Sequence, residues 1–144
     1  MRIMAIDYGD AHTGVAVSDP TLTLCGYSTV VNAYRSETVI EKLRELIAEH
    51  GVTELVLGHP INMDGTRGPR AEKAEGFAEQ LRAATGLPVT LWDERRTTVD
   101  AHNILAANGK RAKERKKTVD AVAASLMLEG YLTLYRRKLQ ENKG

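Results

Sequence analysis

The sequence is poor in cysteine and in aromatic residues. Cys25 is the single cysteine, so no internal disulfide can form, and no Cys/His pairs stand at the spacing of a zinc site. Aromatic residues make up 5% of the chain, which is little material for stacking the bases of a single strand. The cysteine usage indicates a reducing compartment, and we expect a cytoplasmic protein.

The chain also lacks long hydrophobic runs. Its longest apolar stretches have the length of strands, and the N-terminal segment enters a polar turn without the cleavage site of a signal peptide. We therefore predict no membrane partner. The 144 residues, 42% hydrophobic and 27% charged, suit one globular domain. We assign residues 1–139 to that domain and expect residues 140–144 to form a frayed tail.

Charge is balanced over the whole chain but not locally. The net charge is +1, whereas residues 108–117 contain six basic residues and one acid. A basic loop on a nearly neutral body can bind a polyanion without general stickiness. The alternative is a solvated loop without a binding role. The position of this segment just before Asp120 favours a functional loop.

Hydrophobic periodicity predicts the element order βββαβαβα. Three strands before the first helix suggest antiparallel pairing, and the later alternation of strands and helices calls for parallel crossovers. We therefore expect an α/β fold with a mixed five-stranded sheet flanked by helices. The predicted strands cover residues 3–8, 14–18, 22–31, 54–58 and 89–92; the predicted helices cover 36–50 with Gly51 as a stop, a segment opened by Pro69, 97–107 and 118–137.

Three acidic residues far apart in the chain stand at the ends of predicted elements. Asp7 closes the first strand on the same face as Ile3 and Ala5, Glu94 follows the last strand, and Asp120 begins a helix. Each acid alone is equally well explained as a turn cap or a solvated residue. Together they provide the hard oxygen ligands that Mg²⁺ or Mn²⁺ prefers. We predict a catalytic two-metal site with Asp7 as the bridging ligand, and hence a metal-dependent nuclease.

Basic residues are predicted to bind the phosphates of the substrate. The loop of residues 58–70 leads into a helix N-terminus, where backbone N–H groups favour phosphate. An ordinary Asp-Gly turn before a capped helix is the alternative interpretation of this loop. The candidate substrate-binding residues are Arg67, Arg70, Arg95, Lys110, Arg111, Lys113, Arg115, Lys116 and Lys117.

Four short motifs follow one another over nearly the whole chain. They are Ile6-Asp7-Tyr8-Gly9 with residues 14–19, residues 62–66 with Gly68, Asp93-Glu94-Arg95 with Thr97-Thr98, and Lys117 with Asp120 and Ala123-Ala124. In this order they resemble the YqgF family, RuvX-like proteins with a ribonuclease H-like fold. Its members are described as Holliday junction resolvases and as nucleases for the 5′ end of pre-16S rRNA.

The resemblance implies a hydrolase of phosphodiester bonds that acts in ribosome biogenesis, because the family's acidic triad falls on Asp7, Glu94 and Asp120. Two positions depart from the family pattern. Ala11-His12 stand where members usually carry basic residues, and His59 stands where they usually carry leucine. These departures predict a weaker or pH-sensitive phosphate contact beside Asp7.

Other functions compete with this interpretation. The segment at residues 7–9 also resembles the first phosphate loop of actin-like sugar kinases, but those enzymes need two lobes and this chain has the length of one. A non-catalytic nucleic-acid-binding module would use the basic residues alone and gain nothing from three acids. A Holliday junction resolvase would need a two-fold dimer. We expect a monomer or weak homodimer that binds structured RNA, with branched DNA as the alternative.

Overall fold

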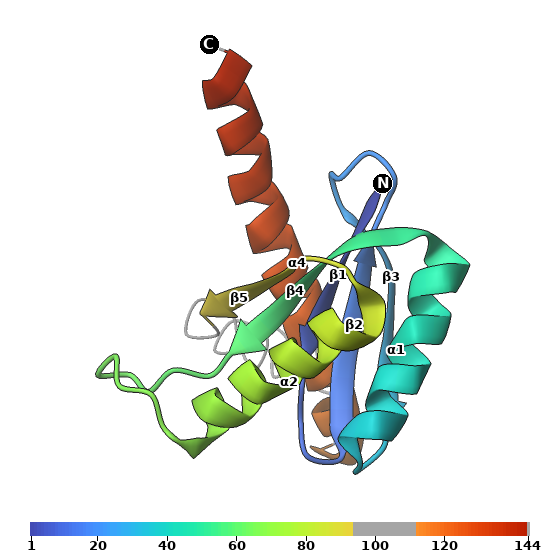
Figure 1. Ribbon diagram of the computed structural model, residues 1–144, viewed down its shortest axis with the longest axis vertical. Helices are drawn as coiled ribbons and strands as arrows, with labels where there is room; N and C mark the ends of the chain where they lie inside the picture. Colours follow the sequence, from blue (N-terminus) through green and yellow to red (C-terminus); the bar gives the residue numbers. More distant parts are fainter. Residues whose placement is uncertain (94–111, 144) are drawn as a thin grey trace.

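The computed structural model describes residues 1–93 and 112–143, of which 112–120, 142 and 143 are described by their helical backbone only. Five strands and three helices follow one another in these residues (Figure 1). They are β1 (Arg2–Asp7), β2 (His12–Ser18), β3 (Cys25–Asn32), α1 (Ser36–His50), β4 (Val52–His59), α2 (Pro69–Thr85), β5 (Val89–Asp93) and α4 (Ala112–Lys143). The predicted order and the α/β class are confirmed.

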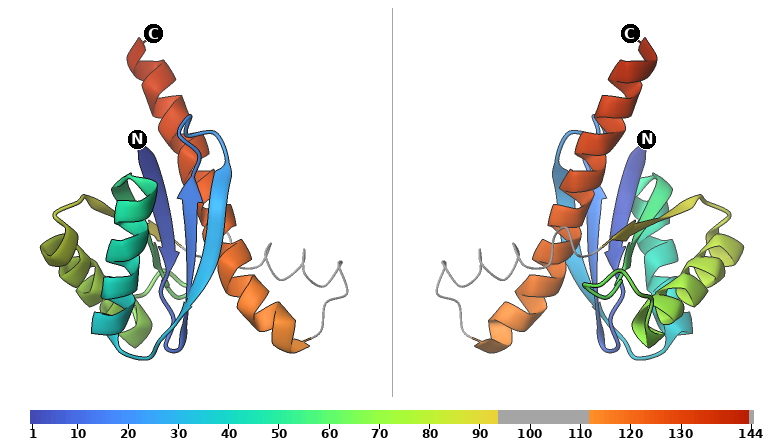
Figure 2. Two further views of the ribbon diagram at one scale, coloured as in Figure 1. Left: turned by 90° about the vertical axis from the view of Figure 1, so that its right-hand side faces the viewer. Right: turned by 90° about the vertical axis from the view of Figure 1, so that its left-hand side faces the viewer.

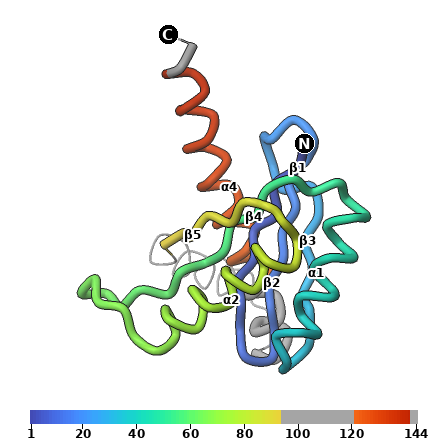
Figure 3. Tube along the Cα trace, in the orientation of Figure 1, coloured from blue at the N-terminus to red at the C-terminus, as the bar shows by residue number. Residues whose placement is uncertain are grey.

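The five strands form one mixed sheet in the order β3-β2-β1-β4-β5. Strand β2 pairs antiparallel with both β1 and β3, whereas β4 pairs parallel with β1 and β5 pairs parallel with β4. The chain trace shows β1, β4 and β5 side by side (Figure 3). Because these three strands run in the same direction, their carboxyl ends meet at one edge of the sheet, which we call the carboxyl edge.

Helices α1 and α2 cover one face of the sheet, and α4 covers the other (Figure 2). Strand alternation supplies the first core with Met4 and Ile6 of β1, against which α1 packs Val39 and Leu43. In the helix opened by Pro69, the helical spacing of apolar residues predicts a buried stripe of Ala71, Ala74, Phe77, Ala78 and Leu81. The structure confirms it, because α2 buries these five side chains. The predicted stop of α1 is confirmed, since Gly51 has φ 67° and its N–H donates to the carbonyl of Ile47.

The second core lies between the sheet and α4. Ile3 and Ala5 of β1 pack there with Trp92 of β5 and the helix residues Met127 and Leu128. Trp92 is therefore a core residue, as predicted. A Cβ on Gly130 of the helix would lie 3.1 Å from the Trp92 ring, so the helix backbone approaches this ring closely.

The elements whose first residue differs most from the prediction are α4 and β3. Helix α4 begins at Ala112 instead of residue 118, because the lysines, arginine and glutamate of residues 112–117 are good helix formers. That part of the predicted basic loop is helical. The third strand starts at Cys25, since Asp19 accepts hydrogen bonds from the N–H groups of Thr23 and Leu24 and holds a turn before it. The predicted helix over 97–107 lies outside the described residues.

Helix α4 also differs from its predicted core face and length. The sequence predicts a core face of Val119, Val122, Ala123, Leu126 and Met127. Ala123 and Met127 are buried as predicted, Val122 and Leu126 are half-buried, and the fully buried side chains also include Ala124 and Leu128. The helix continues to Lys143 and so includes most of the tail predicted to fray. Its last turns extend past the sheet (Figure 1). None of the described helices has the length and apolar character needed to cross a membrane.

Candidate nuclease site at the carboxyl edge

Asp7 stands at the carboxyl edge, where β1 ends. It follows Ile3 and Ala5 on the face that α4 covers, and it is half-buried. Its antiparallel partner is Gly14, which adds no side chain to this face beside the carboxylate. The structure thus places Asp7 as the sequence predicted, at the edge of the sheet where β1 ends.

Gly9 makes the turn that follows Asp7 possible. A Cβ at this position would lie 2.3 Å from the backbone oxygen of His12, a separation that real Cβ atoms do not show. The chain can therefore reverse at this point only with glycine. His12, the first residue of β2, is held in turn by a 2.6 Å hydrogen bond between its Nδ1 and Oδ1 of Asn32.

The other two predicted acids are described only in part. Position 120 lies in α4, one helical turn before the buried Ala123 and Ala124, and the structure describes its backbone only. Glu94 follows Asp93 directly but lies outside the described residues. Among the side chains that the structure describes, no group of three or more potential metal ligands occurs. The three-acid metal site stays a prediction.

Strand β4 ends at the same edge, where His59 pairs with Asp93 of β5. The ring of His59 contacts Glu75 of α2, with 2.7 Å between Nε2 and Oε2. Arg67, one of the predicted phosphate contacts, donates from Nε to the same oxygen over 2.7 Å and from a terminal nitrogen to the other oxygen. Arg67 is thus already paired with a carboxylate in this structure.

Glu75 joins three segments of this edge. Its hydrogen bonds, first that from Arg67 and then that from His59, lower the pKa of its carboxyl from 4.5 to about 2. One carboxylate therefore holds the end of β4, the loop before α2 and the helix itself. Sequence reasoning missed Glu75, because a glutamate in a helix gives no signal until the fold brings a histidine and an arginine to it.

The loop of residues 60–68 carries its own turn. The Asp64 side chain accepts hydrogen bonds from the N–H and the hydroxyl of Thr66, and Gly65 has φ 89°. Asn62 donates from its side chain to the Thr66 hydroxyl. The alternative interpretation of this loop, an Asp-Gly turn that leads into a helix, describes its local structure. Arg70 follows in the first turn of α2.

A second ion pair crosses the edge between α2 and the β1–β2 turn. Lys73 Nζ lies 2.6 Å from Asp10 Oδ1 and 5.6 Å from the centroid of the Tyr8 ring. This hydrogen bond and the lysine charge lower the pKa of Asp10, and Asp10 in turn raises the pKa of Lys73. Sequence analysis missed Lys73 as well, although it lies one helical turn after Arg70.

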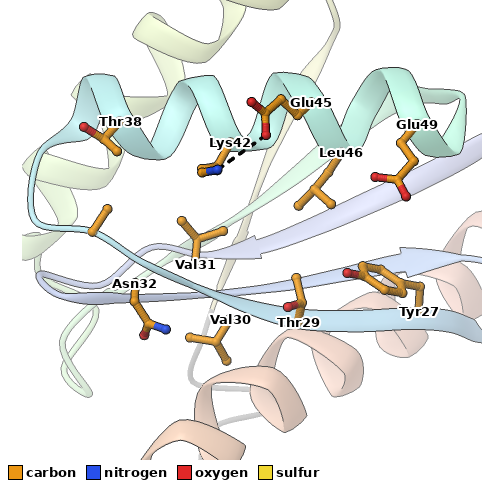
Figure 4. Close-up of a pocket in the computed structure, with 11 residues that line it drawn as sticks. Tyr27, Thr29, Val30, Val31, Asn32, Thr38, Lys42, Glu45, Leu46 and Glu49 are labelled. Carbon is orange, nitrogen blue, oxygen red and sulfur yellow. Dashed lines mark ion pairs between the residues drawn. The ribbon is translucent and has the colours of Figure 1, made fainter.

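A larger groove lies away from this edge, between β3 and α1. It has a volume of about 360 Å³, and Figure 4 shows Val31 and Thr29 on the strand opposite Lys42, Glu45 and Leu46 on the helix. Lys42 is paired with Glu45 at 3.6 Å. The groove opens on the face of the sheet opposite to Asp7. With Glu45 and Glu49 in its wall, it offers no surplus of positive charge to a polyanion.

Residues 1–134 match the model of a protein family described as "RuvX: Holliday junction resolvase". The chain belongs to the RuvX family. A relative from Desulfitobacterium hafniense is 46% identical over 145 aligned positions, which cover 99% of each chain. A relative from Geobacillus kaustophilus is 44% identical over 134 positions, 92% of this chain and 97% of that one. Both relatives are named "Putative pre-16S rRNA nuclease".

Solved structures similar to this RuvX-family chain include Thermus thermophilus RuvC in complex with a Holliday junction substrate. The two share a TM-score of 0.57 at 18% identity, over 88% of this chain and 91% of that one. Another T. thermophilus RuvC structure gives a TM-score of 0.53 at 17% identity, over 88% of this chain and 92% of that one. This likeness concerns the fold and confirms the predicted ribonuclease H-like architecture. The nuclease class predicted from the sequence is confirmed at the level of the family.

The remaining predicted phosphate contacts lie at or beyond the limit of the described part of this RuvX-family chain. Arg95, Lys110 and Arg111 fall outside the described residues. The other four belong to the first turns of α4, where the structure describes the backbone only; they are Lys113, Arg115, Lys116 and Lys117. Their contact with substrate stays a prediction.

Proposed function

We propose that this RuvX-family protein is a metal-dependent nuclease that processes the 5′ end of pre-16S rRNA in the cytoplasm. The observation that carries the proposal is the place of Asp7 at the carboxyl edge, on the sheet face that α4 covers. In open α/β sheets, sites lie beyond the carboxyl ends of the strands. The names of the relatives supply the substrate class.

The residues at this edge fit a divalent cation. Asp7 is half-buried, so its carboxylate is held by the strand and still reaches solvent. Gly14 across the strand pair places no side chain beside it. We assign Asp7, Glu94 and Asp120 as ligands of Mg²⁺ or Mn²⁺, which both prefer carboxylate oxygen. When bound, such ions activate a water molecule and stabilise the leaving oxygen of a phosphodiester.

Arg70 is the described basic residue best suited to meet the phosphates of structured RNA. It stands in the first turn of α2 beside Tyr8 and Asp10 and forms no ion pair with another described residue. Arg67 is less suited to bind phosphate, because its guanidinium is already paired with the carboxylate of Glu75. We also assign phosphate contacts to the basic residues that follow β5 in the chain, which are Arg95, Lys110, Arg111, Lys113, Arg115, Lys116 and Lys117.

Cleavage of four-way DNA is the second candidate function. The description of the family as Holliday junction resolvases and the fold shared with RuvC favour it. A resolvase must cut two strands related by symmetry and therefore works as a dimer. We propose a monomer or weak homodimer for this chain and prefer the RNA substrate.

Cleavage assays on two substrates test this proposal. The wild type and Asp7→Asn are compared on a pre-16S 5′ RNA and on a four-way DNA junction, each with Mg²⁺, Mn²⁺ or a chelator. We expect RNA cleavage that the chelator abolishes. In Asp7→Asn the cleavage rate should fall at least about 100-fold, because losing a metal ligand costs at least as much as losing a residue that hydrogen-bonds to a ligand. Glu41→Gln, which changes an exposed acid on α1, should cleave like the wild type.

The possible outcomes separate the two substrates. Cleavage of the junction without cleavage of the RNA would favour the resolvase. Cleavage that persists in chelator, or that Asp7→Asn leaves unchanged, would contradict the metal site. Circular dichroism of both variants shows whether each one folds.

A further inference from the structure

A small pocket opens at the carboxyl edge between the β1–β2 turn and α2. It lies on the side of α2 and not on the side of α4. Tyr8, Gly9 and Asp10 of the turn form one wall, Pro60 after β4 forms another, and Arg70 and Lys73 of α2 complete it. Two cationic side chains thus face one carboxylate, which leaves an excess of positive charge.

Lys73 and Asp10 of this pocket are paired with each other but accessible. Lys73 Nζ and Asp10 Oδ1 are 2.6 Å apart, and the two side chains are 53% and 87% exposed. Exposed ion pairs contribute little to stability, because water solvates both partners well. Arg70 acts electrostatically on both groups. An incoming anion could therefore replace Asp10 at small cost and would meet two cations.

The position of Lys73 is set by aromatic packing. Tyr8 stacks on Phe77 with ring centroids 3.8 Å apart and planes inclined by 2°. Lys73 Nζ lies 5.6 Å from the centroid of the Tyr8 ring, within the range of a cation–π contact. Phe77 is buried in the core. The Tyr8 ring is held in place by the buried Phe77, and Lys73 lies beside this ring. The ammonium group is therefore ordered before a ligand binds.

The pocket is close to Asp7 along the chain but lies on the other side of β1. Tyr8 follows Asp7 directly, and successive residues of an extended strand point to opposite faces. Asp7 faces α4, whereas Tyr8 packs with the core on the side of α1 and α2. A nucleic-acid strand that crosses the end of β1 with one phosphate at Asp7 would bring a neighbouring phosphate to Lys73.

We propose that Lys73 and Arg70 form a subsite for the phosphate next to the phosphodiester that is cleaved. In the free protein Asp10 is paired with Lys73, and that phosphate displaces Asp10 when the substrate binds. The subsite rests on the proposed nuclease function and adds to it a named second contact. A phosphate offers the charge and the oxygen acceptors that the Asp10 carboxylate provides in the free protein. Asp10 therefore competes with the substrate.

Binding measurements in chelator test the subsite without cleavage. Fluorescence anisotropy gives the Kd of a labelled pre-16S 5′ RNA for the wild type, Lys73→Gln, Asp10→Asn and the control Lys42→Gln. We expect Lys73→Gln to raise the Kd about three- to tenfold and to lower the slope of log K against log salt by about 1. Asp10→Asn should lower the Kd about two- to threefold, because a competing carboxylate is removed.

The opposite signs of the two changes distinguish a subsite from a structural ion pair. If the pair only supported the fold, both variants would weaken binding together or leave it unchanged, and either result would overturn the proposal. Lys42→Gln, which changes an exposed lysine paired with Glu45 on α1, should match the wild type. A fall in affinity in this control equal to that of Lys73→Gln would show a general charge effect and overturn the subsite.

The outcome for the subsite can be separated from that of the nuclease function. Wild-type protein that binds RNA in chelator but cleaves none with Mg²⁺ or Mn²⁺ contradicts the nuclease and leaves the comparison of Kd values readable. Wild-type protein that binds neither the RNA nor a four-way DNA junction overturns the subsite.

Discussion

At the scale of single residues, Gly9 decides how the chain leaves Asp7. A Cβ built on Gly9 would lie 2.3 Å from the backbone carbonyl oxygen of His12 in the β1–β2 turn. A backbone oxygen cannot rotate away as a flexible side chain can. The tight return of the chain, and with it the pairing of Asp7 with Gly14, depends on the absence of a side chain at this position.

We predict that Gly9→Ala destabilises the protein by about 1–3 kcal/mol, the usual cost of forcing additional atoms into a filled space. Urea denaturation followed by circular dichroism measures this change. The control is Gly76→Ala in α2, where a Cβ would meet nothing within 4 Å. Alanine should stabilise that helix by about 0.5–1 kcal/mol. Equal effects of the two substitutions would contradict the predicted clash.

Glu75 makes the stability of the folded protein depend on pH. Its pKa is lowered from 4.5 to about 2 by Arg67 and His59, so its charged form stabilises the folded state. This contribution is complete above the ordinary pKa of 4.5 and is lost as pH falls through about 2. The edge of the sheet should therefore lose this support only under strongly acidic conditions.

We predict that Glu75→Gln is less stable than the wild type at neutral pH, and that the difference shrinks as pH falls from 4.5 toward 2. Urea midpoints measured at several pH values follow the difference. The comparison variant is Glu37→Gln, which removes an exposed ion pair with Arg35 at 3.7 Å and should cost little at any pH. A difference between Glu75→Gln and the wild type that stays constant down to pH 2 would contradict the linkage.

At the scale of elements, α4 is the only described helix on its side of the sheet. It contacts β1, β2 and β3 and buries the second core alone, whereas the opposite face is shared by α1 and α2. Small residues let it lie close, since Ala124 is fully buried and Gly130 passes beside Trp92. The seating of α4 therefore sets where position 120 stands with respect to Asp7.

We predict that Leu128→Ala destabilises the protein by about 2–5 kcal/mol, because this side chain is fully buried beneath α4 and its removal leaves a cavity. Leu139→Ala in the same helix is the control. Its side chain is 44% exposed, and the change should stay within about 0.5 kcal/mol. Thermal unfolding of both variants checks the contrast, and similar losses would mean that the exposed end of α4 is covered in solution.

At the scale of the whole molecule, the sequence predicted the sheet, the order of its elements and the buried stripe of α2. Those features follow from local periodicity, which can be read from a single sequence. The sequence predicted less well the contacts that depend on residues far apart in the chain. Lys73 and Glu75 look like ordinary helix-surface residues until Asp10 arrives from the β1–β2 turn and His59 from β4. The core face of α4 was predicted only in part, because the sheet determines which stripe is covered.

The length of α4 makes its C-terminal end a suitable place to attach a label or a tether. At about 1.5 Å per residue, the helix carries its last turn about 35 Å from position 120, and that end extends past the sheet away from the carboxyl edge (Figure 2). A fluorophore, affinity tag or surface tether attached after the last residue would therefore be held at a distance from the candidate active site. Immobilised protein prepared in this way should present an unobstructed carboxyl edge to long RNA.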